Sequence, residues 1–283
     1  MTALLLLALK LSIVALIFAI GLGSTPADFG YLWRRPALFV RSVFAMYVAV
    51  PLAALAAVRL LDLPLPVKAA ILVLAISAGA PLLPKRLMAL GRESYVFSLV
   101  VTSSLLAVVT VPAWLAVLGP LFGRESTIAP RAVAAVIAKA FLGPLAAGML
   151  LRRPLSRVAD RLSDRILKGG GALLLAAALG LLAAHARLLV EIGWVPLAAL
   201  AGMNAVGLAI GHLFGGPDPA NRTALAVACA TRHVGIAMLA ASTAPGPRVI
   251  ALVLAYLLAS AAVSIPYLNW RRRATGRAPV TGT

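Results

Sequence analysis

The sequence predicts an all-α polytopic membrane protein of about nine transmembrane helices, arranged as inverted repeats with two interrupted helices. Three observations predict this class. Hydrophobic residues make up 62% of the 283-residue chain, charged residues make up only 12%, and the mean hydropathy is +1.01. Apolar runs of about 20 residues, each able to cross a hydrocarbon layer of roughly 30 Å, recur along the whole chain. The positive charges gather in the connections between these runs.

Nine apolar stretches are expected to span the membrane. The first lacks a basic leader and has too long an apolar core for a signal peptide, so we expect an uncleaved span. The spans leave no room for a separate soluble domain, and residues 1–283 are expected to form a single transmembrane domain. The expected spans are Leu4–Gly23, Ala37–Leu61, Val67–Leu90 (interrupted), Ser94–Leu118, Ala132–Leu151, Ile166–Leu189, Trp194–Phe214, Thr223–Ala244 (interrupted) and Arg248–Tyr267.

The net charge of +18, from 26 Lys and Arg against 8 Asp and Glu, predicts a membrane orientation and no nucleic-acid partner. A nucleic-acid-binding domain gathers its cations on one face, whereas these cations lie between apolar spans. If the C-terminus is cytoplasmic and the spans alternate, 17 cations fall on the cytoplasmic side and 6 on the other. The positive-inside rule therefore predicts a multi-pass protein of the cell (inner) membrane, with its N-terminus outside and its C-terminus in the cytoplasm.

The longest cytoplasmic connection, residues 151–170, carries a basic stripe that predicts contact with membrane lipid. Arginines recur at every fourth position, on the helix face opposite a row of apolar residues. Such an amphipathic helix suits the anionic inner leaflet, and a purely architectural role is favoured. The stripe consists of Arg153, Arg157, Arg161 and Arg165, and the apolar face of Leu155, Val158, Leu162 and Ile166.

Two spans contain features that a continuous transmembrane helix does not tolerate. In "ISAGAPLLPKRL", Pro81 and Pro84 each remove a backbone donor and disfavour helix in the preceding residue, and Lys85 follows directly. In "CATRHVGI", Arg232 and His233 lie near the middle of the eighth span, where a lipid-facing cation costs roughly 2.5–3.5 kcal/mol. The two breaks hold the same position in two trios of spans with opposed topology. Such paired breaks predict the binding site of a secondary transporter.

Four segments resemble the bile acid:sodium symporter family and follow the order of that family. They are "RRPALFVRSVFAMYVAVPLAAL", with a mid-helix proline at Pro51; "AISAGAPLLPKRLMALGRESYVFSLVVTSSLLAVVTVPAWL", similar to the first crossing motif; "IAKAFLGPLAAGMLLRRP", with Pro-Leu-x-x-Gly at Pro144, Leu145 and Gly148; and "NRTALAVACATRHVGIAMLAAS", similar to the second crossing motif. The resemblance implies a core domain from spans within residues 37–120 and 194–268, in which the two interrupted helices cross. It implies a panel domain from spans within residues 4–23, 132–151 and 166–189. It also implies an organic-anion substrate driven by sodium, with alternating access as the core moves against the panel.

The sequence departs from the family at the expected ion ligands. The matching positions are Leu82 and Leu83 (or Pro84 and Lys85 with a shifted loop), Val96 and Val100, and Ala228 (or Val227) in place of the family's Glu. No Asp or Glu follows Asp218. Sodium needs several hard oxygen ligands, so the usual sodium sites are expected to be absent. Coupling to protons, coupling to exchange and the absence of coupling all remain open.

The candidate substrate- or ion-binding residues lie at and around the two breaks. Arg232 is the strongest, because ionisable residues inside a membrane are functional by default. Lys85 would replace the charge of sodium or bind a substrate anion, or it would only anchor a helix end at the cytoplasmic surface. His233 would relay protons or pack as a hydrogen-bonded histidine. The remaining candidates are Ser77, Pro81, Pro84, Thr231, Ser98, Thr102 and Asn204, the last three expected mainly in helix–helix hydrogen bonds.

Three further residues in the spans are less informative. Lys10 and Lys139 would face a cavity or reach the membrane interface. Cys229 is expected to be a small core residue, because an isolated free cysteine packs as a small hydrophobe.

The main hypothesis is a secondary transporter of a small organic anion, without a cofactor and independent of sodium. A conventional sodium symporter with backbone carbonyls and Thr231 as ligands is the first alternative, and a channel or a non-transporting sensor is the second. An enzyme is not expected, because the acids lie mostly in loops and form no inward carboxylate pair. No metal site is expected, because the three histidines are scattered, and no P-loop supports ATP-driven transport. The substrate and the oligomeric state are left open.

Overall fold

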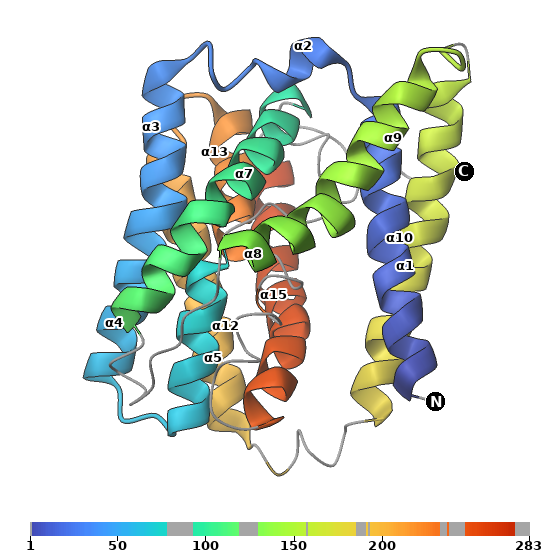
Figure 1. Cartoon of the computed structure of the whole chain (residues 1–283). Coiled ribbons are helices and arrows are strands. Elements are labelled where there is room, and N and C mark those ends of the chain that lie inside the picture. Colours follow the sequence, from blue (N-terminus) through green and yellow to red (C-terminus); the bar gives the residue numbers. More distant parts are fainter. Residues whose placement is uncertain are drawn as a thin grey trace.

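The structure, a computed structural model, is helical throughout the part of the chain that it describes (Figure 1). It describes residues 2–77, 93–118, 130–156, 158–184, 191, 193–232, 237 and 247–274. No strand occurs among these residues, which confirms the all-α class. The elements are α1 (Thr2–Gly23), α2 (Pro26–Phe29), α3 (Pro36–Phe44), η1 (Ala45–Ala49), α4 (Val50–Leu60), α5 (Leu65–Ile76), α7 (Glu93–Leu118), α8 (Pro130–Ile137), η3 (Ala138–Leu142), α9 (Gly143–Arg152), α10 (Ala159–Ala184), α12 (Trp194–Phe214), α13 (Pro219–Ala230) and α15 (Pro247–Ala274).

Six helical stretches of the described chain are long and apolar enough to cross a membrane. They are Leu4–Gly23, Pro36–Leu60, Ser94–Leu118, Ala134–Arg152, Trp194–Phe214 and Ala251–Ala274. They match the first, second, fourth, fifth, seventh and ninth expected spans, although the last continues beyond the expected end at Tyr267. The sixth expected span corresponds to α10, whose first turns are charged. The second halves of the two interrupted spans lie largely outside the described residues, so the total of nine stays a prediction.

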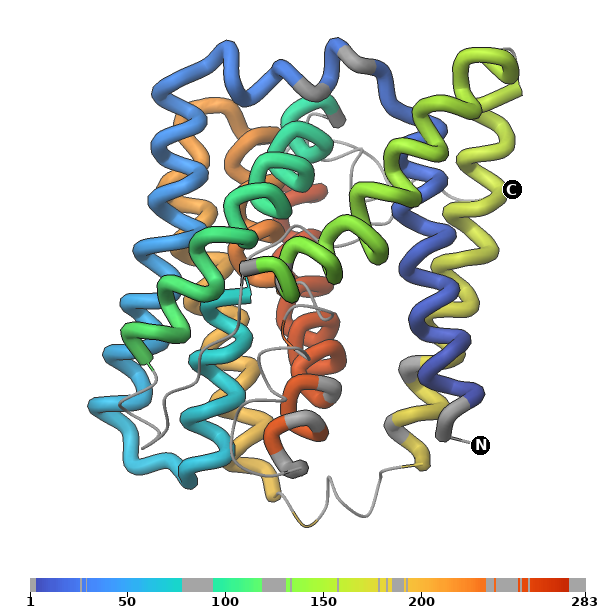
Figure 2. The backbone as a smooth tube through the Cα atoms, in the orientation of Figure 1, coloured from blue at the N-terminus to red at the C-terminus, as the bar shows by residue number. Residues whose placement is uncertain are grey.

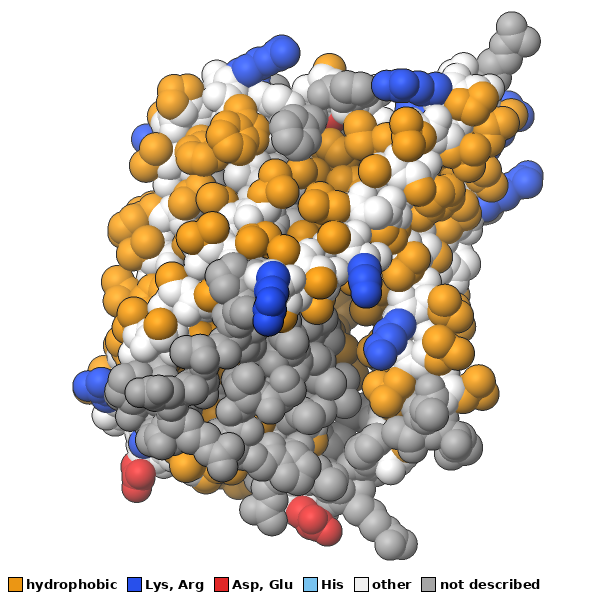
Figure 3. Space-filling view, in the orientation of Figure 1, with side chains coloured by type: hydrophobic (Ala, Val, Ile, Leu, Met, Phe, Trp, Pro, Cys, Tyr) orange, Lys and Arg blue, Asp and Glu red, His pale blue; other side chains and the backbone are white. Residues whose placement is uncertain are grey.

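The surface is that of a membrane protein. Large hydrophobic side chains are exposed on several helices, among them Leu60 at 83%, Trp194 at 78% and Leu213 at 76%. Figure 3 shows hydrophobic side chains over much of the described surface of the visible face, with few Asp and Glu. Exposure of this extent is expected where lipid, and not water, surrounds the helices.

Helices α9 and α10 both pack against α1 along one side of the molecule (Figure 1). The α1–α9 contact is close, because both helices place a glycine in it. A Cβ atom on Gly21 would lie 2.2 Å from the Leu145 carbonyl oxygen, and one on Gly148 would lie 2.2 Å from the Phe18 carbonyl oxygen. Small residues that let backbones approach in this way are typical of helix pairs in membranes.

Two of the membrane-spanning stretches are bent chains of three elements, α3–η1–α4 and α8–η3–α9 (Figure 2). In each, a five-residue π-helical turn is followed directly by a residue and a proline, Pro51 in one and Pro144 in the other. The proline removes one backbone donor and the π-turn shifts the hydrogen-bond register. Each stretch therefore keeps carbonyl groups that the helix itself does not satisfy.

The sequence predicts one amphipathic helix for the basic connection between α9 and α10, but the structure does not show a single helix there. Residues 153–156 form turns, because Pro154 cannot continue α9, and α10 begins only at Ala159. Within α10, Arg161 and Arg165 are exposed while Leu162 and Ile166 are partly buried, as expected. Arg157 lies outside the described residues.

A short connection containing α2 joins α1 to α3 over one end of the bundle and is held by Asp28 (Figure 1). The Asp28 Oδ1 atom accepts from the Ser94 hydroxyl of α7 at 2.6 Å. The Asp28 Oδ2 atom accepts from the Thr25 amide and hydroxyl at 2.8 and 2.7 Å. Burial alone raises the pKa of Asp28, but the bonds from Ser94 and Thr25 and the positive charge of Arg152 outweigh it. The pKa therefore lies below the ordinary value of 3.8.

Asp28→Asn is expected to lower the free energy of unfolding at neutral pH by at most about 1 kcal/mol, because the side chain is only partly buried. Since the folded pKa is depressed, the contribution is fully present above the ordinary carboxyl pKa and is lost as the pH falls through the folded value. Thermal unfolding of both proteins in detergent from neutral to acid pH measures this. The gap between the two melting temperatures should close in acid, and a gap independent of pH would contradict the assignment.

Candidate functional site

Two short helices, α5 and α13, enter from opposite ends of the molecule and end inside it (Figure 2). Each has 12 residues, about 18 Å at 1.5 Å per residue and well short of a hydrocarbon layer. Beyond α5, the Ser77 hydroxyl donates to the Val73 carbonyl at 2.6 Å, and beyond α13, the Thr231 hydroxyl donates to the Val227 carbonyl. The two interrupted spans thus end their first halves in the same way.

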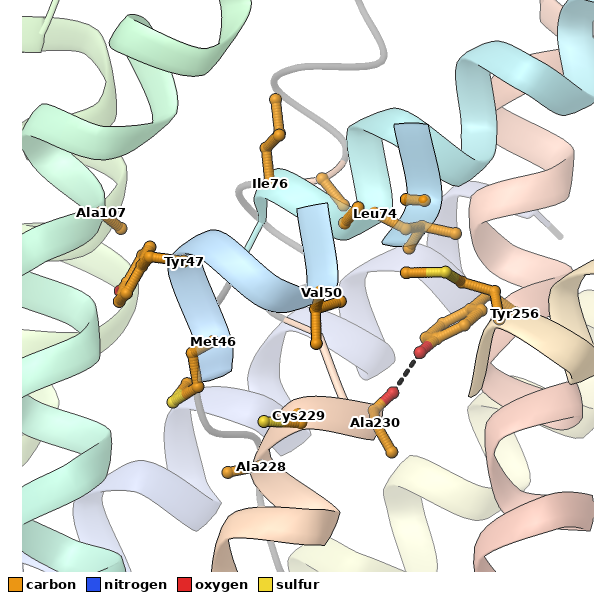
Figure 4. Close-up of a cluster of buried hydrophobic side chains, with 14 of the residues drawn as sticks. Met46, Tyr47, Val50, Leu74, Ile76, Ala107, Ala228, Cys229, Ala230 and Tyr256 are labelled. Carbon is orange, nitrogen blue, oxygen red and sulfur yellow. Dashed lines mark hydrogen bonds between the residues drawn. The ribbon is translucent and has the colours of Figure 1, made fainter. Parts of the chain in front are cut away.

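Both half-helices direct their C-terminal ends toward the interior, and Figure 4 shows Ile76 of α5 and Ala230 of α13 in the same buried cluster. The C-terminal end of a helix carries about half a negative elementary charge. Two such ends together present about one negative charge to the space between them. This part of the molecule therefore favours a positive charge.

The π-helical turn η1 lies between the two helix ends (Figure 4). Met46, Tyr47 and Val50 are buried there among residues of both half-helices. The Tyr47 carbonyl accepts from the Trp114 indole nitrogen at 3.0 Å, and the Tyr47 hydroxyl donates to the Ser103 carbonyl. Helix α7 thus satisfies backbone oxygen that the irregular turn leaves free, and it fixes the turn beside the helix ends.

The end of α13 is held by two buried side chains at its last carbonyl. The Ala230 oxygen accepts from the Asn204 amide nitrogen of α12 at 2.9 Å and from the Tyr256 hydroxyl of α15 (Figure 4). Asn204 is fully buried and Tyr256 is 3% exposed. The last carbonyls of a helix have no partner within the helix, so these bonds are what allows α13 to end in an apolar interior.

Glycines let α12 lie almost directly against the backbone of α13. A Cβ atom on Gly207 would lie 2.7 Å from the Cys229 carbonyl oxygen, and one on Gly211 would lie 2.4 Å from the Leu225 carbonyl oxygen. The spacing of four residues puts both glycines on one face of α12. The position of the α13 end relative to Asn204 therefore depends on this glycine face.

The other end of α13 is fixed by two arginines. Arg222 donates through Nε and Nη2 to the Gly216 carbonyl at 3.1 and 2.9 Å. Arg271 of α15 donates to the Thr223 hydroxyl and to the Pro219 carbonyl, both at 3.0 Å. Both arginines thus donate their hydrogen bonds to groups at or near the start of α13 and stabilise that end of the helix.

Arg232 differs from both. It follows the end of α13, only 4% of its surface is exposed, and its Nη1 and Nη2 atoms have no hydrogen-bond partner. Its charge acts on the side chains of Tyr47, Cys229 and Tyr256. The Tyr256 hydroxyl lies beside the guanidinium but donates to Ala230. A buried guanidinium with unmade hydrogen bonds costs free energy, so its retention requires another explanation than stability.

No acid near Arg232 neutralises it among the described residues. The described acids lie in connections between the named helices, in α2, or in the first two turns of a helix; they are Asp28, Asp62, Glu93, Asp160, Asp164, Glu191 and Asp218. Among described side chains, Arg152 forms an ion pair with Asp160 at 2.8 Å. The sequence adds that residues 78–92 and 233–246, which complete the two interrupted spans, contain no Asp or Glu. Among the described groups, the partial negative charges at the C-terminal ends of α5 and α13 are therefore what offsets the positive charge of Arg232.

The structure brings some of the sequence-predicted residues together and separates others. Ser77, Thr231, Asn204 and Arg232 lie at the two helix ends or against them. Cys229 is buried, which confirms the expectation of a small core residue. Pro81, Pro84, Lys85 and His233 lie outside the described residues.

Ser98 and Thr102 face the connection between α2 and α3, not Arg232. The Ser98 hydroxyl accepts from the Leu32 amide at 3.0 Å, and the Thr102 hydroxyl accepts from the Trp33 indole nitrogen at 3.1 Å. Lys10 and Lys139 are both exposed. As candidate ligands these residues stay predictions.

The sequence-based analysis did not single out Tyr47, Tyr256 or Trp114. A signal was present, because each puts a polar group within an apolar span, and buried Tyr and Trp usually find a hydrogen-bond partner. What the sequence does not contain is the partner, since these bonds join residues far apart in the chain.

Three of the described oxygens at the two helix ends are already engaged in hydrogen bonds. The Ser77 and Thr231 hydroxyls donate to their own helices, and the Ala230 carbonyl already accepts two donors. No group of three or more His, Cys, Asp or Glu able to hold a metal ion occurs in the described part of the chain. A sodium ion requires several free hard oxygens, and the Ser77, Thr231 and Ala230 oxygens already make hydrogen bonds within the protein.

Paired half-helices that end inside a membrane protein, beside an unpaired buried cation, are typical of secondary transporters. A sequence model described as the Sodium Bile acid symporter family matches residues 10–192, and the chain belongs to that family. A relative from Arabidopsis thaliana is 29% identical over 150 residues, which cover 51% of this chain and 36% of that protein. It is described as "Probable sodium/metabolite cotransporter BASS6, chloroplastic". The chain thus spans about a third of the length of this relative.

Proposed function

We propose that this protein is a secondary active transporter that carries a small organic anion by alternating access, with Arg232 as a fixed positive charge in place of sodium. The observation that carries the proposal is the buried Arg232 guanidinium at the end of α13, with Nη1 and Nη2 unpaired. Family membership supports a transporter and not an enzyme.

The electrostatics of the helix ends support the substitution for sodium. The two inward-facing C-terminal ends favour about one positive charge. Arg232 supplies such a charge covalently, at the end of α13 itself. A transporter with this charge built in gains nothing from a bound sodium ion at the same place, so we expect transport without a sodium requirement.

The unpaired donors of Arg232 support an anionic substrate. A guanidinium binds a carboxylate through two parallel hydrogen bonds, and such charge-assisted bonds are about twice as strong as neutral ones. Because no described acid occupies these donors, an anion arriving from outside the protein would complete them.

The arrangement of the helices fits movement of two parts. In the proposal, α1 forms the panel together with α9 and α10, which both pack against it. The helices that carry α5, α13 and Arg232 form the core. The connections richest in Lys and Arg would face the cytoplasm, with the N-terminus outside and the C-terminus inside.

A ligand screen followed by uptake tests the proposal. Purified protein would be heated with a panel of organic anions and with neutral analogues of the same size, and anions that raise the melting temperature would be offered to proteoliposomes. We expect at least one anion both to stabilise the protein and to be accumulated or exchanged, because binding to the folded state stabilises it. Equal shifts with neutral analogues, or binding without uptake, would contradict a transporter of anions.

A conventional sodium symporter is the second candidate function, favoured by the family's description and by the cotransporter name of the relative. Its ligands would have to be backbone carbonyls and the Thr231 hydroxyl. Because that hydroxyl donates to Val227, sodium binding would require this bond to rearrange.

A further inference from the structure

Trp270 of α15 is an exposed aromatic side chain that its neighbours hold in place. Its surface is 53% exposed. The centroid of its ring lies 5.5 Å from that of His212 in α12 and 5.8 Å from that of Tyr267, and the Arg271 guanidinium carbon lies 5.4 Å from the same centroid. Tyr267 and His212 are in turn joined by a hydrogen bond of 2.8 Å between the hydroxyl and Nδ1. An aromatic side chain that contacts three others and is still half exposed presents a fixed face to its surroundings.

Exposed apolar side chains precede Trp270 along α15, and an exposed cation follows it. Ile265 lies five residues before it and is 56% exposed, and Leu213 at the same end of α12 is 76% exposed. Arg273 lies three residues after Trp270 and is exposed. At 1.5 Å per residue these steps are about 7.5 and 4.5 Å along the helix axis. The exposed face of α15 therefore presents apolar, aromatic and cationic groups in the order in which acyl chains, interface and phosphates follow one another in a leaflet.

The end of the molecule around Trp270 is strongly basic. Residues 212–223 and 264–274 form the neighbouring ends of α12, α13 and α15, which hydrogen bonds join, and we call them the basic end. They contain one acid, Asp218, whose side chain caps α13. They contain four arginines, Arg222, Arg271, Arg272 and Arg273. Because four positive charges face one negative charge, this end of the molecule attracts anions.

We infer that the basic end binds an anionic phospholipid, with the Trp270 indole at the level of the headgroup and Arg273 at the phosphate. A guanidinium and a phosphate form charge-assisted hydrogen bonds, and tryptophan is enriched where one end of its ring is apolar and the other is wet. The exposed Ile265 and Leu213 favour a lipid over free phosphate, because acyl chains can cover them. This lipid is not the transported substrate, so the inference goes beyond the proposed function and does not depend on it.

A second copy of the chain is disfavoured as the occupant of this surface. Two copies related by a two-fold axis would bring the same patch of each together. The arginines of the two basic ends would then repel one another. An anionic headgroup instead neutralises part of this charge, as expected of basic clusters at the cytoplasmic ends of transmembrane helices.

Quenching of tryptophan fluorescence by brominated phospholipids tests the inference on the full-length protein. The protein would be reconstituted into phosphatidylcholine vesicles that contain a small fraction of either phosphatidylglycerol or phosphatidylcholine brominated close to the headgroup. Subtracting the signal of Trp270→Phe isolates the contribution of Trp270. We expect phosphatidylglycerol to bind beside Trp270 at least roughly fivefold more tightly than phosphatidylcholine, the contribution of one arginine near an anionic headgroup.

Arg273→Gln should lower this preference for phosphatidylglycerol roughly fivefold. Arg59→Gln is the matched control. It removes another exposed arginine, from the last turn of α4, which ends on the opposite side of the molecule from the start of α13 (Figure 1). It should leave the preference unchanged. Both side chains are exposed, so both variants should fold, and thermal unfolding checks this.

Equal quenching of Trp270 by the two brominated lipids, or a preference that survives Arg273→Gln, would overturn the inference. So would a preference that inorganic phosphate abolishes, because the basic end would then bind free phosphate and not a lipid. Quenching by neither lipid, with Trp270 emission that changes with protein density in the vesicles, would show a second copy on this surface and would also overturn it. None of these outcomes requires anion uptake, so they leave the proposed function unaffected.

Discussion

Arg232→Gln is expected to reduce anion uptake at least roughly thirtyfold, because removing one partner of a buried charged hydrogen bond costs about 2–5 kcal/mol. Glutamine removes both the charge and the paired donors. The melting temperature should stay the same or rise, because the variant also removes a buried charge with unmade hydrogen bonds. Initial uptake rates in proteoliposomes and thermal unfolding of the same preparation measure the two effects.

Arg222→Gln is the matched control for this prediction. It removes a positive charge from the first turn of α13, at the opposite end of the helix from Arg232, where the side chain bonds the Gly216 carbonyl. We expect Arg222→Gln to lower the melting temperature and to retain uptake, the reverse of Arg232→Gln. If Arg232→Gln lowered the melting temperature and kept full uptake, Arg232 would be a structural residue and not part of the site.

Gly211→Ala is expected to destabilise the protein by more than about 2 kcal/mol, the upper range of the cost of overpacking. The new Cβ atom would lie 2.4 Å from the Leu225 carbonyl oxygen and 2.5 Å from the Ala226 Cα atom. Both are backbone atoms, so α13 as a whole must move, and the bonds to Ala230 would be strained. Thermal unfolding in detergent measures the loss, and uptake should fall with it.

Gly202→Ala on the same helix is the control. Gly202 is exposed, and a Cβ atom there would meet nothing within 4 Å. Alanine favours helix over glycine by about 1 kcal/mol, so the melting temperature should hold or rise slightly. Similar losses from the two substitutions would show that close packing of α12 on α13 does not determine stability.

The helices and the break at Arg232 could be predicted from the sequence, because both depend on local patterns. Apolar runs of the right length predict six of the spans, and most of the predicted ends lie within a few residues of the observed ones. A cation in such a run is rare enough to mark a site by itself. The end of α13 also follows a local rule, since its last carbonyls must find partners.

The partners at the helix ends could not be predicted, because they depend on packing between distant segments. Asn204 and Tyr256 each lie 26 residues from Ala230, and Trp114 lies 67 residues from Tyr47. Similarly, the Ser98 hydroxyl accepts from the amide of Leu32 in the α2–α3 connection, 66 residues away. Hydroxyl groups in apolar spans must find a partner, yet the sequence does not say which segment provides it.

The family match does not include the second half of the candidate site. It covers residues 10–192 and ends before α12, so Asn204 and Arg232 lie beyond it. The case for these two residues rests on their burial and their unpaired atoms.

The most direct test of the central claim is uptake of the best-binding anion into proteoliposomes with an inward sodium gradient and, in parallel, with choline in place of sodium on both sides. If Arg232 provides the positive charge that the two helix ends favour, the initial rates under the two conditions will be equal. A rate that falls to background without sodium would contradict the account, because the fixed charge would then not have replaced the ion.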